Sequence, residues 1–236
     1  MHVEELTSAE FAKFVRKNPV VFVPFGATEA HGVHLPLGTD SIQPEALCDA
    51  LADRLDGLVM PPVRYGHHSS TRKMPGTMAL RYDTLRMITT DLLESMERNG
   101  ITKAVIISGH AGTLHLAAIK DAAEDFVRRS SMRLMVLTDY DIAYKFPMEE
   151  DKEWPDGHGG VIETSRILAL RPDLVKKQRP KGKFQDKRYK VVADPETCMP
   201  EGMVGDASKA TAPLGEKVND FIIERLVDLV EKNLME

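Results

Sequence analysis

The sequence predicts an α/β fold, with a single domain over residues 1–236 that has three layers (α/β/α) around a mostly parallel sheet. Two observations lead to this prediction. Short apolar runs alternate along the chain with longer segments whose apolar residues recur at helical spacing. The length of 236 residues fits one domain of this class, and the contents of 42% hydrophobic and 28% charged residues are typical of a globular protein.

Each predicted strand is a short apolar run. VVFVPF at residues 20–25 is the first, and KAVIIS at residues 103–108 is the third. The four predicted strands cover residues 20–25, 58–63, 103–108 and 133–138. Because nearly continuous apolar runs are typical of strands buried on both faces, they predict a parallel sheet with helices on each side.

Each predicted helix has apolar residues three or four positions apart. Residues 83–99 are the clearest case, and Asn99 with Gly100 marks a helix C-terminus. The predicted helices cover residues 42–55, 83–99, 114–129, 161–170 and 213–234. Residues 180–211 are rich in Gly, Pro and charge, and predict a long excursion that contains a small hairpin.

Charge and cysteine content exclude several classes of partner. The net charge is −5 and the basic residues are scattered, which argues against nucleic acid. The basic cluster at residues 176–190 is interpreted as a solvated loop or as the rim around a small anion. Cys48 and Cys198 form no CxxC pair, so we expect a reduced, cytoplasmic protein. No window approaches the ~20 apolar residues of a membrane span, and we expect no membrane partner.

The segment after the first predicted strand is dense in groups that bind metal ions. Residues 29–40 contain Glu29, His31, His34 and Asp40. Glu29 and His31 are two residues apart, so in an extended segment their side chains share one face. Asp40 reaches them only if the intervening Gly and Pro residues turn the chain back. Imidazole and carboxylate ligands together suit Zn²⁺ or Mn²⁺ better than an ion that prefers thiolates.

Two later segments add further groups of the same kind. His110 directly follows the third predicted strand. His158 lies on a glycine-rich turn, and Glu163 lies near the start of the predicted helix 161–170. Because the carboxyl ends of parallel strands meet at one edge of a sheet, we expect these side chains to converge with the first group.

Each of these residues also has a structural interpretation. A lone histidine is usually structural, and Asp40 alone would cap the helix that begins near residue 42. Aspartate is common in turns, which would explain Asp156. The negative charge of Glu163 in a first turn would interact favourably with the helix dipole. Several acid and imidazole groups at successive strand ends are harder to explain by capping, so a metal site is the preferred interpretation.

Four segments, EAHGVHLPLGTD, SGHAG, HGGVIETS and GDASKATAPLGE, resemble the signature segments of the creatininase (creatinine amidohydrolase) family, and the match extends over residues 20–217. The resemblance implies a creatininase-like α/β fold, two divalent metal ions (Zn and/or Mn), and a homo-oligomer, which is a homohexamer in many members. It implies that Glu29 and His110 hold one ion, that His31 holds the other, and that Asp40 bridges them.

The chain departs from creatininase at one metal ligand. Creatininase carries a second glutamate at the position of Gly112, and Glu163 is our candidate for the missing ligand. The resemblance also assigns a proton-carrying role to His158.

The resemblance makes Trp154 a predicted substrate contact, and Asp156 and His34 are further predicted contacts. Ala111 and Pro155 stand where creatininase has a tyrosine and an aspartate, which argues against creatinine itself as the substrate.

The predicted function is that of a metal-dependent amidohydrolase of the creatininase type, acting on a small molecule. A metal-bound hydroxide would open a small cyclic amide or a related C–N bond, and His158 would carry a proton to the leaving nitrogen. The alternatives are a hydrolase of an inositol-derived ring ketone, a peptidase on the same site, or a non-catalytic metal-binding scaffold. The sequence contains no G-x-S-x-G elbow, and no G-x-G-x-x-G follows the first strand, which argues against a serine hydrolase and a dinucleotide enzyme.

Overall fold

A four-stranded parallel sheet forms the centre of the protein, seen in a computed structural model that describes residues 1–149 and 151–236. The strand order is β2–β1–β3–β4. The strands are β1 (Val21–Phe25), β2 (Leu58–Val59), β3 (Lys103–Ser108) and β4 (Arg133–Thr138). In the parallel register, Phe22 pairs with Val59 on one side and with Val105 on the other.

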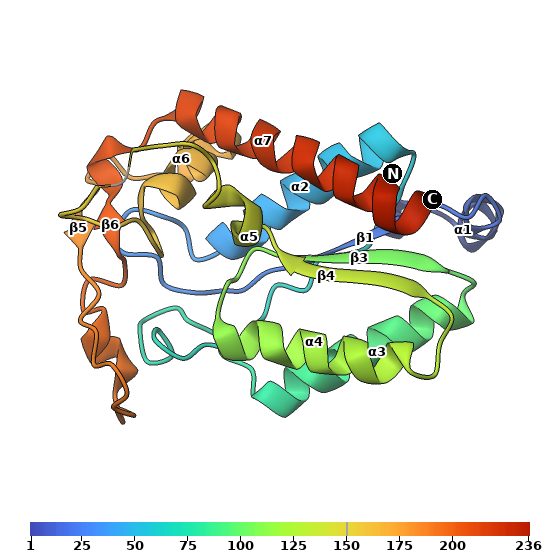
Figure 1. Ribbon diagram of the computed structural model, residues 1–236, viewed down its shortest axis with the longest axis horizontal. Coiled ribbons are helices and arrows are strands. Elements are labelled where there is room, and N and C mark those ends of the chain that lie inside the picture. The colour runs from blue at the N-terminus through green and yellow to red at the C-terminus, as the bar shows by residue number, and fades with distance from the viewer. Residues whose placement is uncertain (150) are drawn as a thin grey trace.

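Helices cover both faces of this sheet, which confirms the predicted α/β/α layers (Figure 1). One face packs against α3 (Tyr82–Arg98) and α4 (Thr113–Val127). The other packs against α2 (Thr39–Leu55), α6 (Val161–Leu170) and α7 (Ala212–Val230), with the short α5 (Tyr140–Ala143) beside them. The remaining elements are α1 (Ser8–Val15), η1 (Val3–Glu5), η2 (Pro172–Leu174), η3 (Pro195–Cys198), η4 (Ala207–Lys209), η5 (Glu231–Met235), β5 (Lys181–Gly182) and β6 (Gly205–Asp206).

Alternate residues of the central strands supply two separate cores. Phe22 of β1 and Val105 of β3 point into the core beneath α2 and α7. Val23 of β1 and Ile106 of β3 point into the core beneath α3 and α4. All four side chains are almost completely buried, as expected for strands covered on both faces.

The structure corrects the bounds of several predicted elements. The second strand ends at Val59 rather than at residue 63, because Pro61 and Pro62 have no N–H to donate to a neighbouring strand. Helix α2 begins at Thr39, with Gly38 as its N-cap. Asp40 is therefore a residue of the first turn and not the cap considered in the sequence.

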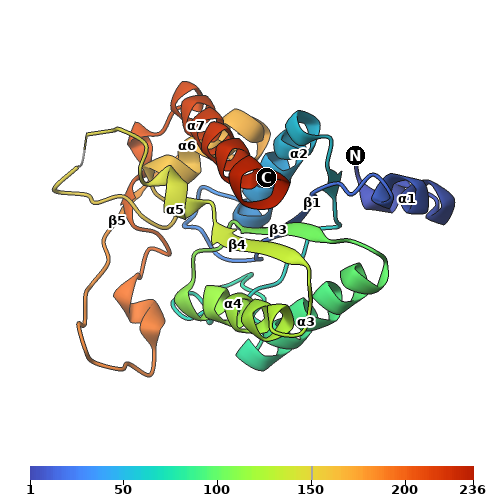
Figure 2. The same ribbon diagram turned by 45° about the vertical axis from the view of Figure 1, so that its right-hand side comes forward.

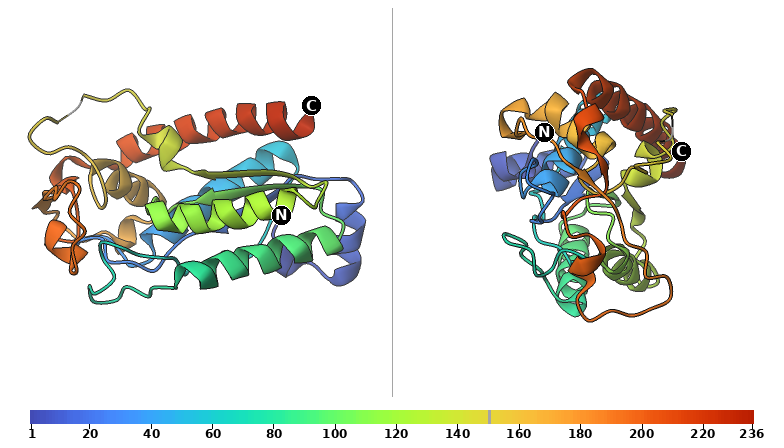
Figure 3. Two further views of the ribbon diagram at one scale, coloured as in Figure 1. Left: turned by 60° about the horizontal axis from the view of Figure 1, so that its bottom comes forward. Right: turned by 90° about the vertical axis from the view of Figure 1, so that its left-hand side faces the viewer.

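The excursion lies at the end of the molecule toward which the strands run (Figure 3). Its two short strands, β5 and β6, pair antiparallel, but residues 183–204 lie between them, so they form no tight hairpin. Helix α1 lies at the opposite end, beside the layers (Figure 2), and none of its residues is buried. Among the described helices, none has the length and apolar character needed to cross a membrane.

Candidate metal centre

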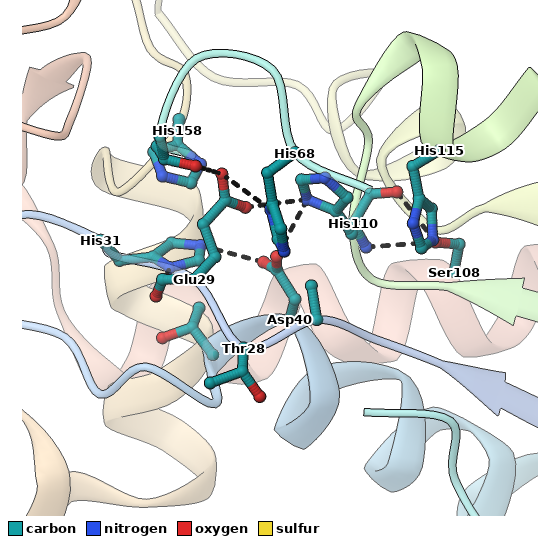
Figure 4. A network of polar contacts seen from close by, with 12 residues as sticks. Thr28, Glu29, His31, Asp40, His68, Ser108, His110, His115 and His158 are labelled. Carbon is teal, nitrogen blue, oxygen red and sulfur yellow. Dashed lines mark hydrogen bonds and ion pairs between the residues drawn. The ribbon is translucent and has the colours of Figure 1, made fainter. Parts of the chain in front are cut away.

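The five predicted metal ligands converge at the carboxyl ends of β1 and β3, and Figure 4 shows four of them, Glu29, His31, Asp40 and His110. Glu29 and His31 lie in the segment that follows β1, and His110 lies directly after β3. Asp40 and Glu163 each stand in the first turn of a helix, α2 and α6 respectively. All five side chains are buried.

Asp40 stands between two histidines. Its Oδ1 lies 2.9 Å from His31 Nε2, and its Oδ2 lies 3.0 Å from His110 Nδ1. Glu29 completes one side, with Oε2 at 2.9 Å from His110 Nδ1. Glu163 completes the other, with Oε2 at 3.6 Å from His31 Nε2. The carboxylate of Asp40 is thus shared by a Glu29–His110 group and a His31–Glu163 group.

Backbone carbonyls fix which nitrogen of each histidine faces the centre. His31 Nδ1 donates to the carbonyl of Glu29 at 3.0 Å. His110 Nε2 donates to the carbonyl of His67 at 3.1 Å. Because a carbonyl can only accept, each of these nitrogens carries a hydrogen, and the opposite nitrogen faces the carboxylates. Histidines that bind metals are usually oriented in this way.

The turn after β3 brings His110 against α2. A Cβ on Gly109 would collide with the Asp40 carbonyl and with the ring of Pro44, so only glycine permits this approach. Gly112 is equally confined, since a Cβ there would lie 2.6 Å from His110 Nε2.

The charges of the centre favour a bound cation. Burial lowers the pKa of His31, but Asp40 and Glu163 raise it to about 10. Burial likewise opposes protonation of His110, and the charges of Glu29 and Asp40 hold its pKa well above the ordinary value. Burial raises the pKa of Glu29, but His110 and His158 bring it well below the ordinary value. Burial likewise raises the pKa of Asp40, but His31 and His110 bring it below the ordinary value, so Glu29 and Asp40 stay ionised at neutral pH and attract positive charge.

His158 and His34 occupy different environments. His158 is half-buried, its Nε2 lies 2.8 Å from the carbonyl of Ala30, and its ring centroid lies 4.0 Å from that of His31. His34 is completely buried, and its Nε2 contacts the Gly159 carbonyl at 3.0 Å and Thr164 Oγ1 at 2.9 Å. Only His158 borders the cavity of the centre.

That cavity has a volume of about 330 Å³. The lining includes four of the five predicted ligands, the hydroxyl groups of two serines, and three apolar side chains from the excursion and its flank. Those named residues are Glu29, Asp40, His110, Glu163, Ser69, Ser70, Phe184, Met199 and Val204. None of the five predicted ligands lines the cavity beside Trp154 or two shallower cavities elsewhere on the described chain.

Trp154 and Asp156 line a neighbouring cavity of about 710 Å³. Lys183 Nζ lies 4.3 Å from the centroid of the Trp154 ring. Asp156 accepts hydrogen bonds from the backbone N–H groups of Val161 and Ile162, in the first turn of α6. The structure thus places these two predicted substrate contacts outside the cavity of the centre, and Asp156 at a helix N-terminus.

A family model described as creatinine amidohydrolase matches residues 4–230. The chain belongs to the creatininase family. The creatinine amidohydrolase of Pseudomonas putida is 30% identical over 98% of this chain and 96% of its own length. A mycofactocin precursor peptide peptidase of Mycolicibacterium smegmatis is 26% identical, over 91% and 85%. The 3-dehydro-scyllo-inosose hydrolase of Thermotoga maritima is 24% identical, over 98% and 82%.

Solved creatininase structures share the fold of this family member. A structure named Creatininase Mn has a TM-score of 0.87 and 28% identity, and the match covers 98% of this chain and 97% of that chain. A creatininase variant of Zn-Zn type has a TM-score of 0.87 and 27% identity, with the same coverage. The predicted family and fold class are confirmed, and this creatininase-family chain is a hydrolase.

The residues of this creatininase-family centre fit divalent ions. Glu29 Oε2 and Asp40 Oδ2 are buried, and neither accepts a hydrogen bond of good geometry from any residue in 1–149 or 151–236, although His110 Nδ1 is near both. Two triads, Glu29–His68–His110 and His31–Asp40–Glu163, each bring one ligand atom per residue within 4.8 Å of the others, and a third group, Glu29–His31–His158, meets the same limit. Such mixed imidazole and carboxylate sets suit zinc and manganese.

The residue that the sequence analysis did not select is His68. It lies in the loop between β2 and α3, next to His67, and is almost completely buried within one of the two triads. The available signal was the His67-His68 pair itself, in the loop that follows the second strand. Its place beside Glu29 depends on tertiary contacts of this loop, which no local pattern specifies.

Proposed function

We propose that this creatininase-family hydrolase binds two divalent ions, zinc or manganese, and uses them to open a small cyclic amide or a related C–N bond. The observation that carries the proposal is the position of Asp40, whose two oxygens face His31 and His110 at 2.9 and 3.0 Å. A carboxylate shared by two groups of ligands is the arrangement that a two-metal centre needs.

The ligand assignment follows from the same distances. Glu29 and His110 would hold one ion, and His31 and Glu163 would hold the other. Asp40 would contribute one oxygen to each ion. Ions bound there supply a water molecule acidic enough to act as nucleophile near neutral pH, and they polarise the carbonyl that is attacked. In this assignment, Glu163 replaces the carboxylate ligand that is absent at Gly112. A measurement of bound ions tests the assignment.

His158 is suited to carry the proton in this reaction. Its Nε2 bears a hydrogen that is held by the carbonyl of Ala30, so Nδ1 is the nitrogen free to accept a proton and to release it to a leaving nitrogen. The half-buried ring borders the cavity, where a substrate can reach it.

The cavity supports a small substrate. Its volume of about 330 Å³ lies at the lower end of small-molecule sites. Ser69 and Ser70 offer hydroxyl groups, and Phe184 offers an apolar surface. Among the described residues that line it there is no Lys or Arg. Lys181 and Lys183 lie over the ring of Trp154 instead.

The test is hydrolysis by protein that has been stripped of metal with a chelator and then reloaded with Zn²⁺ or Mn²⁺. Five- and six-membered lactams and cyclic ureides are the first substrates, and a keto-inositol and short peptides test the two alternative activities. We expect ring opening that disappears on chelation and returns with metal. Hydrolysis that persists without metal, or none of any substrate by the reloaded protein, would contradict the proposal.

A further inference from the structure

We propose that His68 is a metal ligand, which binds the same ion as Glu29 and His110. This inference rests on the proposed function, because it assumes that divalent ions occupy the centre. His68 would give that ion two imidazoles and the carboxylates of Glu29 and Asp40, a complete set of four protein ligands. The two ions would then have different surroundings, one with two imidazoles and one with a single imidazole.

The first observation is that the ring nitrogens of His68 are buried and make no hydrogen bond to the described residues. Its exposed fraction is 1%, and neither Nδ1 nor Nε2 has a hydrogen-bond partner within the described part of the chain. Buried polar atoms are almost always paired, since an unpaired one costs free energy of folding. A structural histidine would be expected to bond through at least one nitrogen. A bound cation removes this deficit.

The second observation is the direction in which His68 points. Its Nδ1 lies 3.4 Å from Glu29 Oε1, and its ring centroid lies 4.8 Å from that of His110 (Figure 4). Thr71 donates a hydrogen bond to Glu29 Oε1, which leaves Oε2 as the oxygen that accepts none from the described residues. His68, His110 and Glu29 therefore surround one point, and their ligand atoms lie within 4.8 Å of one another.

The third observation is that the backbone holds His68 in this position. The N–H of His67 donates to His115 Nδ1 at 3.2 Å, and the carbonyl of His67 accepts from His110 Nε2 at 3.1 Å. His115 is completely buried, and Gly66 lets its ring approach, since a Cβ there would lie 2.8 Å from His115 Nδ1. The same contact that orients His110 thus anchors the residue next to His68, so the two imidazoles are placed together.

The experiment compares His68→Phe with His67→Phe. Phenylalanine keeps a buried ring at position 68 but has no nitrogen, so packing is largely retained while the ligand is lost. His67 is the matched control, because it is adjacent and its ring only contacts the carbonyl of Leu80 at 3.1 Å. Binding of Zn²⁺ and Mn²⁺ is measured by equilibrium dialysis, and thermal unfolding of the metal-free proteins checks their folding.

We expect His67→Phe to bind two ions, each with the same affinity as in the wild type. His68→Phe should bind one of them at least ~10-fold more weakly, since even outer contacts to metal ligands change affinity by 10–100-fold. Its metal-free form should unfold at the same temperature as the wild type or higher, because two unpaired nitrogens are removed. If the phenylalanine does not fit, His68→Ala with added imidazole replaces it, and imidazole should restore the lost ion.

Two results separate the failures. If the wild type binds two ions and His68→Phe binds both with unchanged affinity, the role of His68 is disproved while the proposed function stands. If the wild type binds no divalent ion at all, the proposed function itself fails, and the ligand role of His68 fails with it.

Discussion

The Nε2 atom of His31 lies 2.9 Å from Oδ1 of Asp40, and both side chains are almost completely buried. Their opposite charges offset the cost of burial, as the raised pKa of His31 shows. The same carboxylate turns its second oxygen to His110, so Asp40 contacts both histidines, and Glu29 Oε2 also contacts His110. The centre therefore has two halves, and each half makes a separate prediction.

Glu163→Gln should weaken the binding of one ion and leave the binding of the other unchanged. In the wild type, Glu163 Oε2 accepts a hydrogen bond from the backbone N–H of Gly159. The amide oxygen of glutamine can accept the same bond, so the first turn of α6 is preserved. The negative charge beside His31 is lost, however, and the His31 ion loses a ligand. We expect about one equivalent of metal in place of two, measured by elemental analysis after dialysis. Two equivalents at unchanged affinity would remove Glu163 from the ligand set.

His158→Ala should separate metal binding from catalysis. Because His158 Nε2 is hydrogen-bonded to the carbonyl of Ala30 and His158 is not one of the proposed ligands, we expect both ions to remain. Loss of a proton carrier typically costs 10²–10⁴-fold in rate, and we expect a fall in kcat of that order. The measurement is steady-state hydrolysis of whichever substrate the panel identifies, with metal content determined on the same sample. Full activity with both ions bound would show that another group carries the proton.

His34 should make the metal-free protein less stable in acid. Burial lowers its pKa from the ordinary 6.5 to about 4. Between these values the unfolded chain binds the proton and the folded chain does not, so the stability due to neutral His34 is present above pH 6.5 and is lost as the pH falls toward 4. In His34→Gln, the free energy of unfolding should fall less steeply across this window, by up to ~1.4 kcal/mol per pH unit. Urea unfolding with a chelator present measures it, and parallel curves for the two proteins would contradict the assignment.

The parts of the fold that depend on apolar pattern could be predicted from the sequence. Strands β3 and β4 and helix α6 have the predicted bounds, because continuous apolar runs and helical spacing are local signals. Helix α1 was not predicted, although Thr7 and Glu10 form a capping box that marks its start. The pairing of β5 with β6 could not be predicted, since it joins two-residue strands that lie far apart in the chain.

The candidate site divides in the same way. Glu29, His31 and His110 follow strands, so the topology of a parallel sheet predicts their convergence. His68 follows no strand of the predicted length, and its position depends on contacts of the His67 peptide with His110 and His115. Trp154 lies outside the cavity of the centre for a comparable reason, because its loop packs against the lysines of the excursion.

The bridging role of Asp40 is the central claim, and metal content tests it most directly. Wild type, Asp40→Ala and Asp156→Asn are purified without added metal, and zinc and manganese are counted per chain. Asp156 serves as the control because its carboxylate binds the backbone of α6 and not the centre. We expect two equivalents in the wild type and in Asp156→Asn, and close to none in Asp40→Ala. An Asp40→Ala protein that is folded and still holds two equivalents would contradict the two-metal centre described here.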